Sequence, residues 1–396
     1  MVKKNFWCAV IVGFVALVYM TFGSASAIQA ETMKMGCIAP LSGPGAPWGR
    51  ALCDGVSLAM NDVNKAGGLK IGKKTYQLEL IEYDDKYTGE GAAQAANRLI
   101  SVDKVNIIFG SIGSAPVLAF TPITQKAKVL VLGNSSTNKA IHPGNTYFFR
   151  VIQTDWERAE VIIPYVAKKH PEAKTVAFIA PNDESGRFTT SADVHFLTKA
   201  GVKVVYNELY ERSQTDFAPQ LTKILKLNPD ILDTSASSPG TTGLIAKQAR
   251  SMGYKGIFVT SSGFMAKTVV EIAGKAAEGF YFCAAADLAS SAPKMKDFIA
   301  KYKSLFKKDC DQWSCPLFYD GAHIVFSLMQ KQQTTDSTKL RDALEQIKSW
   351  EGVTGEMRFS GKETYGIAHQ AKGPQYAVTV QDGKEKILEL VSPWGD

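Results

Sequence analysis

The sequence has little of what metal-dependent and nucleophilic enzymes need. Five histidines are scattered over 396 residues, and their spacing fits no metal-ligand motif. There is no G-x-S-x-G motif, and the glycine-rich segment GSIGSA lacks the lysine of a phosphate-binding loop. We therefore expect a protein that is not an enzyme and that uses no metal and no cofactor.

The sequence also lacks a large net charge of either sign. The 45 lysines and arginines face 38 acidic residues, a formal charge of +7. The charge falls to +5 when Lys3 and Lys4 leave with the signal peptide that we predict below. Because both signs are interspersed, the sequence shows no electrostatic footprint of nucleic-acid binding, and we expect no nucleic-acid partner.

Residues 1–27 are typical of a cleaved secretory signal. Two lysines precede an apolar core over Phe6–Phe22, and Ala25–Ala27 is a small-residue cleavage pattern. We expect cleavage after Ala27, with Ala30 as the alternative, and no lipid attachment because Cys8 lies too early. No later stretch is apolar enough to span a bilayer. The sequence therefore predicts a soluble protein that is exported to the periplasm.

Cysteine is sparse, and its count is informative. Five cysteines follow the signal, an odd number that leaves at least one unpaired in a single chain. Cys310 and Cys315 frame a short loop, so we predict a local disulfide between them in an oxidising compartment. Spacing leaves open whether Cys37 and Cys53 meet, and Cys283 in an apolar strand is typical of a core residue.

The sequence is rich in alternating strand and helix patterns. Four predicted strands separated by amphipathic helices occupy Thr32–Pro40, Gln77–Asp85, Val105–Phe109 and Val129–Leu132. The same order restarts after Thr154, and the strand ends Ile38–Pro40 and Ile179–Pro181 share the letters IAP. Such alternation predicts an α/β fold with parallel sheets covered by helices. The length favours two domains.

Two turns of hydroxyl residues follow neighbouring strands of the first predicted sheet. Ser114 precedes a helix predicted over Ala115–Ala127, and Ser135, Ser136 and Thr137 follow the next strand. Free N–H groups and the dipole at a helix start attract an anion, most simply a carboxylate. The alternative is that Ser114 is an ordinary N-cap and that the second turn is an ordinary turn.

Several motifs, taken in order, make the sequence similar to a known family. They include IAPLSGPGAPWG (38–49), GVSLAMNDVNKAGG (55–68), IFGSIGS (108–114), GNSST (133–137), NDESG (182–186) and QARSMGY (248–254). The sequence resembles the leucine/isoleucine/valine-binding branch of the type I periplasmic binding proteins, the solute receptors of ABC importers. The resemblance implies two doubly wound α/β lobes, joined by a three-strand hinge, that close over a ligand. The implied lobes are residues 28–153 plus 284–364 and residues 154–283 plus 365–396.

The resemblance also implies roles for single residues. In amino-acid-binding members, a serine after the fourth strand holds the ligand carboxylate, and the next turn supplies further donors. These roles fall on Ser114, Ser135 and Thr137, and the aromatic residue that covers the ligand falls on Trp48.

The second lobe departs from the family pattern. Ser185 stands at a position that usually holds an aromatic residue, and Ser237 or Ser238 stands where amino-acid binders often carry tyrosine. Ser262 stands where those proteins place the glutamate that pairs with the ligand ammonium. A buried ammonium without a partner costs several kcal/mol. Either another acid replaces the glutamate or the ligand has no ammonium.

Three acids are candidate substitutes, namely Asp183, Glu184 and Asp320. We favour a ligand without the ammonium, an aromatic or branched carboxylic acid that suits Trp48 and the small second-lobe side chains. The protein would deliver it, as a monomer, to the membrane permease of an ABC importer. The alternatives are a binding protein for branched-chain or other amino acids and a ligand-sensing subunit of a signalling complex.

Overall fold

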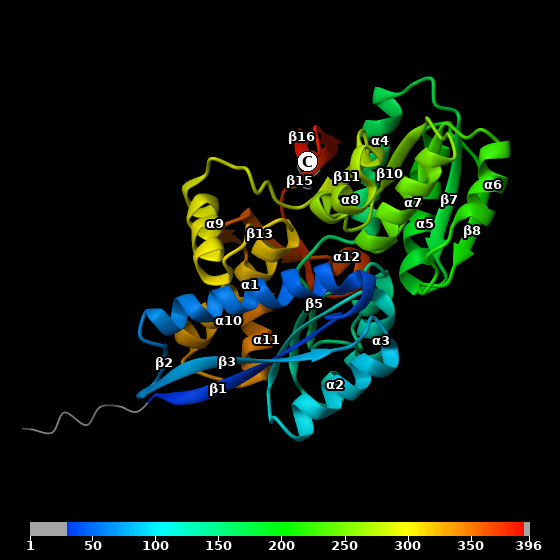
Figure 1. Cartoon of the computed structure of the whole chain (residues 1–396). Helices are drawn as coiled ribbons and strands as arrows, with labels where there is room; N and C mark the ends of the chain where they lie inside the picture. Colours follow the sequence, from blue (N-terminus) through cyan, green and yellow to red (C-terminus); the bar gives the residue numbers. More distant parts are fainter. Residues whose placement is uncertain (1–29, 392–396) are drawn as a thin grey trace, which may run out of the picture.

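The structure is a computed structural model that describes residues 30–391, so the predicted signal peptide lies outside the described residues. Two α/β lobes, each built on its own sheet, lie one against the other (Figure 1). The predicted fold class is confirmed. Among the described residues, no helix combines the length and the hydrophobicity that a membrane crossing needs.

The first lobe contains a nine-stranded sheet in the order β12-β13-β14-β6-β5-β4-β1-β3-β2. Its parallel centre consists of β1 (Glu31–Ala39), β3 (Lys74–Asp84), β4 (Ile107–Ile112), β5 (Leu130–Asn134) and β6 (Phe148–Arg150). The edge strands are β2 (Leu69–Ile71) and β12 (Trp350–Gly352), and β13 (Gly355–Ser360) and β14 (Gln370–Lys372) lie between β12 and β6. Every residue of β4 and β5 is buried, because helices cover both faces of a parallel sheet.

Helices of two chain segments cover this sheet. The first segment supplies α1 (Ala46–Lys65), α2 (Gly89–Ser101) and α3 (Ser114–Ala127). The later segment supplies α9 (Pro293–Phe306), α10 (Ser314–Gln332), α11 (Ser337–Glu345) and the short α12 (Lys362–Tyr365). Helices α1 and α10, far apart in sequence, lie side by side (Figure 1).

The second lobe contains a seven-stranded sheet in the order β16-β15-β11-β10-β9-β7-β8. The parallel strands are β7 (Thr175–Pro181), β8 (Lys203–Tyr210), β9 (Ile231–Asp233), β10 (Ile257–Thr260) and β11 (Tyr281–Ala284). The antiparallel hairpin of β15 (Gln375–Gln381) and β16 (Lys384–Val391) completes the sheet. The helices are α4 (Asp155–Lys169), α5 (Glu184–Lys199), α6 (Ala218–Lys226), α7 (Pro239–Ser251) and α8 (Ala266–Ala273).

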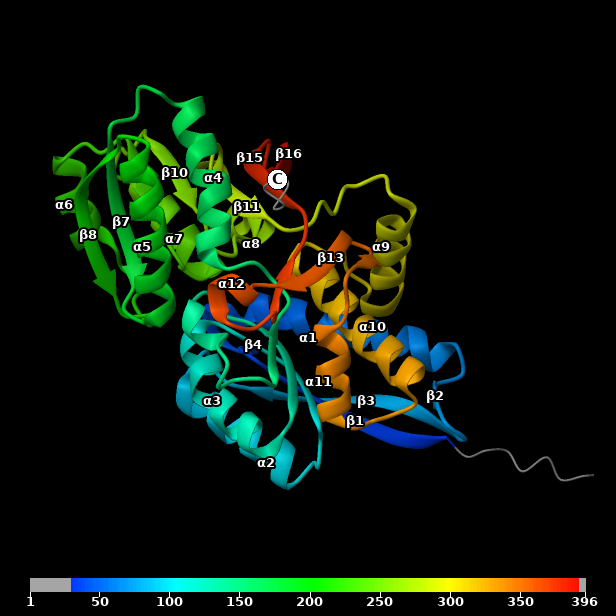
Figure 2. The same cartoon turned by 180° about the vertical axis from the view of Figure 1, so that it is seen from behind.

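The chain crosses between the lobes three times, after β6, after β11 and after β14 (Figure 2). The third crossing differs from the predicted boundary between residues 364 and 365. Gln370 of β14 pairs with Arg150 of β6, and the rest of β14 pairs with β13, so this strand still belongs to the first sheet. The crossing therefore falls just before β15.

The predicted disulfide between Cys310 and Cys315 is wrong. Cys37 of β1 is bonded to Cys53 of α1, with their Cα atoms 6.2 Å apart, because this helix packs directly on the strand that precedes it. In the described residues, Cys283, Cys310 and Cys315 carry free thiols. Cys315 lies buried in the first turn of α10, and the thiol of Cys310, which interacts with that of Cys315, also donates to the carbonyl of Gln312.

The repeated IAP letters have a structural counterpart in the two lobes. A Cβ atom added to Gly49 of α1 would overlap the carbonyl oxygen of Pro40, and one added to Gly186 of α5 would overlap that of Pro181. Only glycine permits each helix to start so close to the end of its strand. Both helix starts are thereby held at the carboxyl ends of the parallel strands, where open α/β sheets bind ligands.

Candidate functional site

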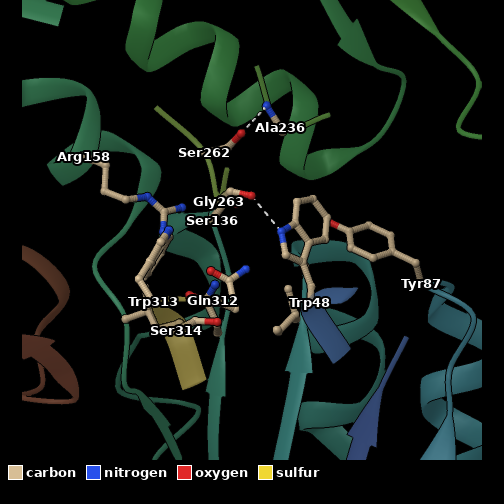
Figure 3. A pocket seen from close by; sticks show the side chains of 14 residues that line it. Trp48, Tyr87, Ser136, Arg158, Ala236, Ser262, Gly263, Gln312, Trp313 and Ser314 are labelled. Carbon is tan, nitrogen blue, oxygen red and sulfur yellow. Dashed lines mark hydrogen bonds between the residues drawn. The ribbon is translucent and has the colours of Figure 1, made fainter. Parts of the chain in front are cut away.

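A cavity lies between the lobes, beyond the carboxyl ends of the central strands. Its volume is about 30 Å³ in this conformation, and residues of both lobes line it (Figure 3). The first lobe and the first crossing supply Trp48, Tyr87, Ile112, Gly113, Asn134, Ser136, Ile152, Gln312, Trp313 and Ser314. The second lobe supplies Arg158, Ala236, Ser262 and Gly263.

Two tryptophans of the first lobe hold a second-lobe loop over this cavity. The indole N–H of Trp48 donates to the carbonyl of Gly263 at 2.7 Å, and that of Trp313 donates to the carbonyl of Phe264 at 3.1 Å. A Cβ atom on Gly263 would lie 3.4 Å from Trp48 and 4.0 Å from Trp313, so this glycine sits between the two indoles. The tryptophans therefore contribute both apolar surface and bonds between the lobes.

Arg158 brings a positive charge into the cavity. It lies in the first turns of α4, which begins with a capping box formed by Thr154 and Glu157. The side chain is only 2% exposed, forms an ion pair with Asp155, and its guanidinium carbon lies 5.8 Å from the centre of the Trp313 ring. Burial lowers the pKa of Arg158 to about 10, so the guanidinium stays charged near neutral pH.

Several buried polar atoms around the cavity have no hydrogen-bond partner within residues 30–391. They include Nε and Nη1 of Arg158, Oδ1 of Asn134, Oε1 of Gln312 and Oγ of Ser314. Buried polar groups are normally paired, so such a group at a cavity wall is available to a ligand. Of the lining residues that the structure describes, none is an aspartate or a glutamate.

Three of the residues predicted from the sequence line the cavity: Trp48, Ser136 and Ser262. The Ser262 hydroxyl accepts a hydrogen bond from the backbone N–H of Ala236 at 2.9 Å and lies 2.8 Å from the hydroxyl of Thr260. It therefore fixes the shape of this wall.

The predicted anion-binding turn lies next to the cavity but is bonded within the protein. The backbone N–H of Ser114 donates to the hydroxyl of Ser185 at 2.9 Å, across the lobe interface. The Ser114 hydroxyl accepts from the backbone N–H of Thr137 at 3.1 Å, and the Thr137 hydroxyl donates to Glu184 at 2.9 Å. In this conformation, the backbone N–H of Ser114 and the hydroxyl of Thr137 already donate within the protein.

Arg150 of β6 stabilises the second hydroxyl turn, residues 135–137, through hydrogen bonds. Its Nη1 donates to the carbonyls of Ser135 at 2.9 Å and Thr137 at 2.7 Å, and its Nε donates to Gln370. Ser135 is fully buried and does not line the cavity.

The remaining predicted serines lie near the start of α7. The hydroxyl of Ser237 accepts from the hydroxyl of Tyr210 at 2.9 Å, and the hydroxyl of Ser238 lies 2.8 Å from that of Thr241. Both serines are buried and neither lines the cavity.

The three candidate acids also have protein partners. Asp183 caps α5 and pairs with Arg212 at 2.5 Å, and Glu184 pairs with Lys139 at 2.9 Å. Asp320 accepts bonds from the turn between β12 and β13, away from the cavity. The structure brings none of these carboxylates into the cavity lining.

Sequence reasoning missed Arg158, although a signal was present. Arg158, Ile162 and Val166 recur every fourth residue and share the buried face of α4. A charged residue on the apolar face of an amphipathic helix marks a position where the fold buries a charge. Trp313 was missed because its loop was interpreted as the interior of a disulfide.

Over the part of the chain that the structure describes, no three His, Cys, Asp or Glu side chains are grouped to hold an ion.

Comparison with known proteins places these features in a family. The sequence profile of a family described as "Periplasmic binding protein" matches residues 32–385. The leucine-, isoleucine-, valine-, threonine-, and alanine-binding protein of Pseudomonas aeruginosa is 26% identical over 350 residues, which cover 88% of this chain and 91% of that protein.

Two solved structures show the same architecture. One is a branched-chain amino acid transporter substrate binding protein of Streptococcus pneumoniae in complex with isoleucine, with a TM-score of 0.79 at 26% identity over 91% of this chain and 99% of that one. The other is a solute binding protein of an ABC transporter from R. palustris in complex with benzoate, with a TM-score of 0.79 at 18% identity over 91% and 97% of the two chains.

Proposed function

The chain belongs to the periplasmic binding protein family, and from that premise we propose that it is an exported receptor that closes on a small carboxylate and delivers it to the permease of an ABC importer. Members of this fold bind different solutes, since one neighbour holds isoleucine and another holds benzoate. The ligand class therefore depends on the residues of this chain's own cavity.

The charge of the cavity carries the proposal. Arg158 supplies a cation, whereas the described lining contains no carboxylate that could pair with an ammonium group. An α-amino acid would bury its ammonium there at a cost of several kcal/mol. Ser262 supports the same conclusion, because it stands where the resemblance places the ammonium-binding glutamate. The ligand is an aromatic or branched carboxylic acid that lacks an α-amino group.

The apolar part of the lining suits the body of such a ligand. Trp48, Tyr87 and Trp313 present ring surfaces, and Ile112 and Ile152 add aliphatic surface. Aromatic rings bury large apolar areas and stack favourably on other rings. A flat aromatic acid uses both the rings and the charge of the site.

Contacts between the lobes support a closing trap rather than a permanently open groove. The bonds from Trp48 to Gly263 and from Ser114 to Ser185 join residues on opposite sides of the three crossings. Breaking these bonds opens the cavity, and a ligand that touches both lobes favours their closure. Such a receptor releases its ligand unchanged, so no chemical step is required of the site.

A thermal-shift screen of the mature protein tests the proposal. The panel contains benzoate, 4-hydroxybenzoate and short branched carboxylic acids, with leucine, isoleucine and other α-amino acids beside them. Because a ligand that binds the native state raises Tm by mass action, at least one simple carboxylate should raise it. A rise with leucine or isoleucine, and with no simple carboxylic acid, would overturn the ligand class and favour an amino-acid receptor.

A further inference from the structure

Two of the three guanidinium nitrogens of Arg158 have no hydrogen-bond partner in the described chain. Its Nη2 forms the ion pair with Asp155, whereas Nε and Nη1 have no partner in the described chain although the side chain is buried. A buried cationic donor without an acceptor is more costly than a neutral one. An acceptor supplied from outside the protein would remove that cost.

The carboxylates around Arg158 do not cover these two nitrogens. Asp155 pairs with Nη2, and its second oxygen accepts a bond from the hydroxyl of Thr189. Asp193 acts on Arg158 through its charge, but one of its oxygens accepts from Ser235 at 3.0 Å and no bond joins it to the guanidinium. The fold therefore leaves these two nitrogens of a cavity-lining residue without a protein acceptor.

The position of the guanidinium fits a ligand that touches aromatic rings. In Figure 3, Arg158 lies against Trp313 on one side of the cavity, and Trp48 and Tyr87 lie on the other side. A carboxylate at Arg158 directs the body of a small ligand towards these rings, and the lobes have to part to admit it, because the cavity measures only about 30 Å³ in this conformation. The start of α3 is less suited to this role, because Ser185 already accepts the bond from the Ser114 N–H.

We propose that Arg158 is the residue that pairs with the carboxylate of the ligand and so makes the receptor selective for anions. The inference rests on the proposed function, since it assigns the charge recognition within that same cavity. Arginine suits this role because its planar guanidinium matches the geometry of a carboxylate.

A charge-matched pair of variants tests the assignment. Asp155→Asn keeps Arg158 and removes its internal partner, whereas Asp155→Asn/Arg158→Gln removes the ion pair as a whole and leaves no buried charge behind. Benzoate and its neutral counterpart benzamide are titrated into each mature protein by calorimetry. If the screen identifies a tighter carboxylate than benzoate, that acid and its primary amide are used instead.

We expect the wild type and Asp155→Asn to bind benzoate and to prefer it over benzamide. The double variant should bind benzoate about 100-fold more weakly than Asp155→Asn, and its preference over benzamide should disappear. Arg250→Gln, which removes an arginine that is not part of the cavity lining, should change neither quantity.

Equal benzoate affinity in Asp155→Asn and the double variant would overturn the role of Arg158 and leave the proposed function intact. If no carboxylate binds the wild type, the proposed function itself fails. If the double variant does not fold, Arg158→Lys decides instead: it should bind benzoate about 10-fold more weakly than the wild type but keep the preference over benzamide. Unchanged affinity or a lost preference in Arg158→Lys would contradict the assignment.

Discussion

Two buried arginines lie on either side of the first crossing between the lobes, and they are used differently. Arg150 is fully buried and donates to the carbonyls of Ser135 and Thr137 and to Gln370. Arg158 is almost as buried, makes one ion pair and lines the cavity, and two of its nitrogens are unpaired, against one nitrogen of Arg150. Burial lowers the pKa of both.

The difference shows that burial alone does not distinguish a structural charge from a binding charge. The partners of Arg150 are backbone and side-chain oxygens of its own fold, so its charge stabilises the turn beside the cavity. Arg158 lacks such oxygens at two of its nitrogens. The comparison predicts that loss of Arg150 lowers stability and that loss of Arg158 lowers affinity.

The largest effect should come from Arg150→Met. This change leaves the carbonyls of Ser135 and Thr137 and the amide of Gln370 without their donor, and each buried unpaired group costs about 1–3 kcal/mol. We expect the free energy of unfolding to fall by about 3–5 kcal/mol in urea titrations. A loss as large in the Asp155→Asn/Arg158→Gln variant would abolish the distinction between the two arginines.

Loss of the disulfide should also lower stability, and because the disulfide lies outside the cavity lining it serves as a control for Arg150→Met. Cys37 and Cys53 are separated by 16 residues in sequence, and a disulfide closing a loop of that size stabilises by about 3 kcal/mol. Cys37→Ser/Cys53→Ser should lower the free energy of unfolding by that amount and change ligand affinity less than threefold. Thiol titration of the unfolded mature wild type should count three free thiols, and a peptide map that links Cys310 to Cys315 would contradict this pairing.

A smaller effect concerns pH and the acids near Arg158. Asp193 and Asp233 accept bonds from the same Ser235 hydroxyl at 3.0 and 2.5 Å. Burial raises the pKa of Asp233 to about 7, and burial together with Asp233 raises that of Asp193 as well. The folded protein therefore retains protons that the unfolded chain releases near pH 4.

The sign follows from the retained protons. The stabilisation by the neutral acids is complete below about pH 4 and is lost as the pH rises towards 7, by about 1.4 kcal/mol per pH unit for each retained proton. Urea unfolding between pH 4.5 and 7 should show this fall, and Asp233→Asn should flatten it. Other buried acids add to the slope, so a slope that is unchanged in Asp233→Asn would remove this pair as its cause.

Much of the fold could be predicted because its signals are local. Buried strands, helix starts and the repeated IAP ends follow from neighbouring residues, and they predict two α/β lobes correctly. The third crossing could not be placed, because β14 has three residues and its membership depends on pairing with the distant Arg150. The disulfide failed for a related reason, since proximity in sequence favoured Cys310 and Cys315.

Residues of the candidate site were predictable where they belong to a sequence motif, and they were not predictable where tertiary packing alone brings them to the cavity. Trp48, Ser136 and Ser262 lie in or beside motifs and line the cavity. Trp313 is held at the cavity by its hydrogen bond to the carbonyl of Phe264, and Arg158 lies on a face of α4 whose sequence pattern predicts core. Local sequence also does not show that the Ser185 hydroxyl of the second lobe accepts a hydrogen bond from the Ser114 N–H of the first lobe.

The smallest effect should come from Ser114→Ala, and it separates the two sites at which a carboxylate could be held. The sequence alone predicts a loss of about 1–3 kcal/mol in affinity, the penalty for a charge left short of a donor. In the structure, Ser114 is fully buried and does not line the cavity, and its hydroxyl accepts from the backbone N–H of Thr137, so the variant should lose about 1 kcal/mol of stability and less than threefold in affinity.

Ser185→Ala sharpens this last comparison, because it frees the N–H of Ser114 while leaving the serine in place. If the carboxylate lay at the start of α3, this variant would bind benzoate more tightly and Ser114→Ala would bind it at least 10-fold more weakly. With the carboxylate at Arg158, Ser185→Ala removes a bond that holds the lobes closed, and its affinity should fall slightly or stay unchanged. A gain in benzoate affinity in Ser185→Ala, measured by the same calorimetry, would therefore indicate that the carboxylate binds at the start of α3 in the first lobe.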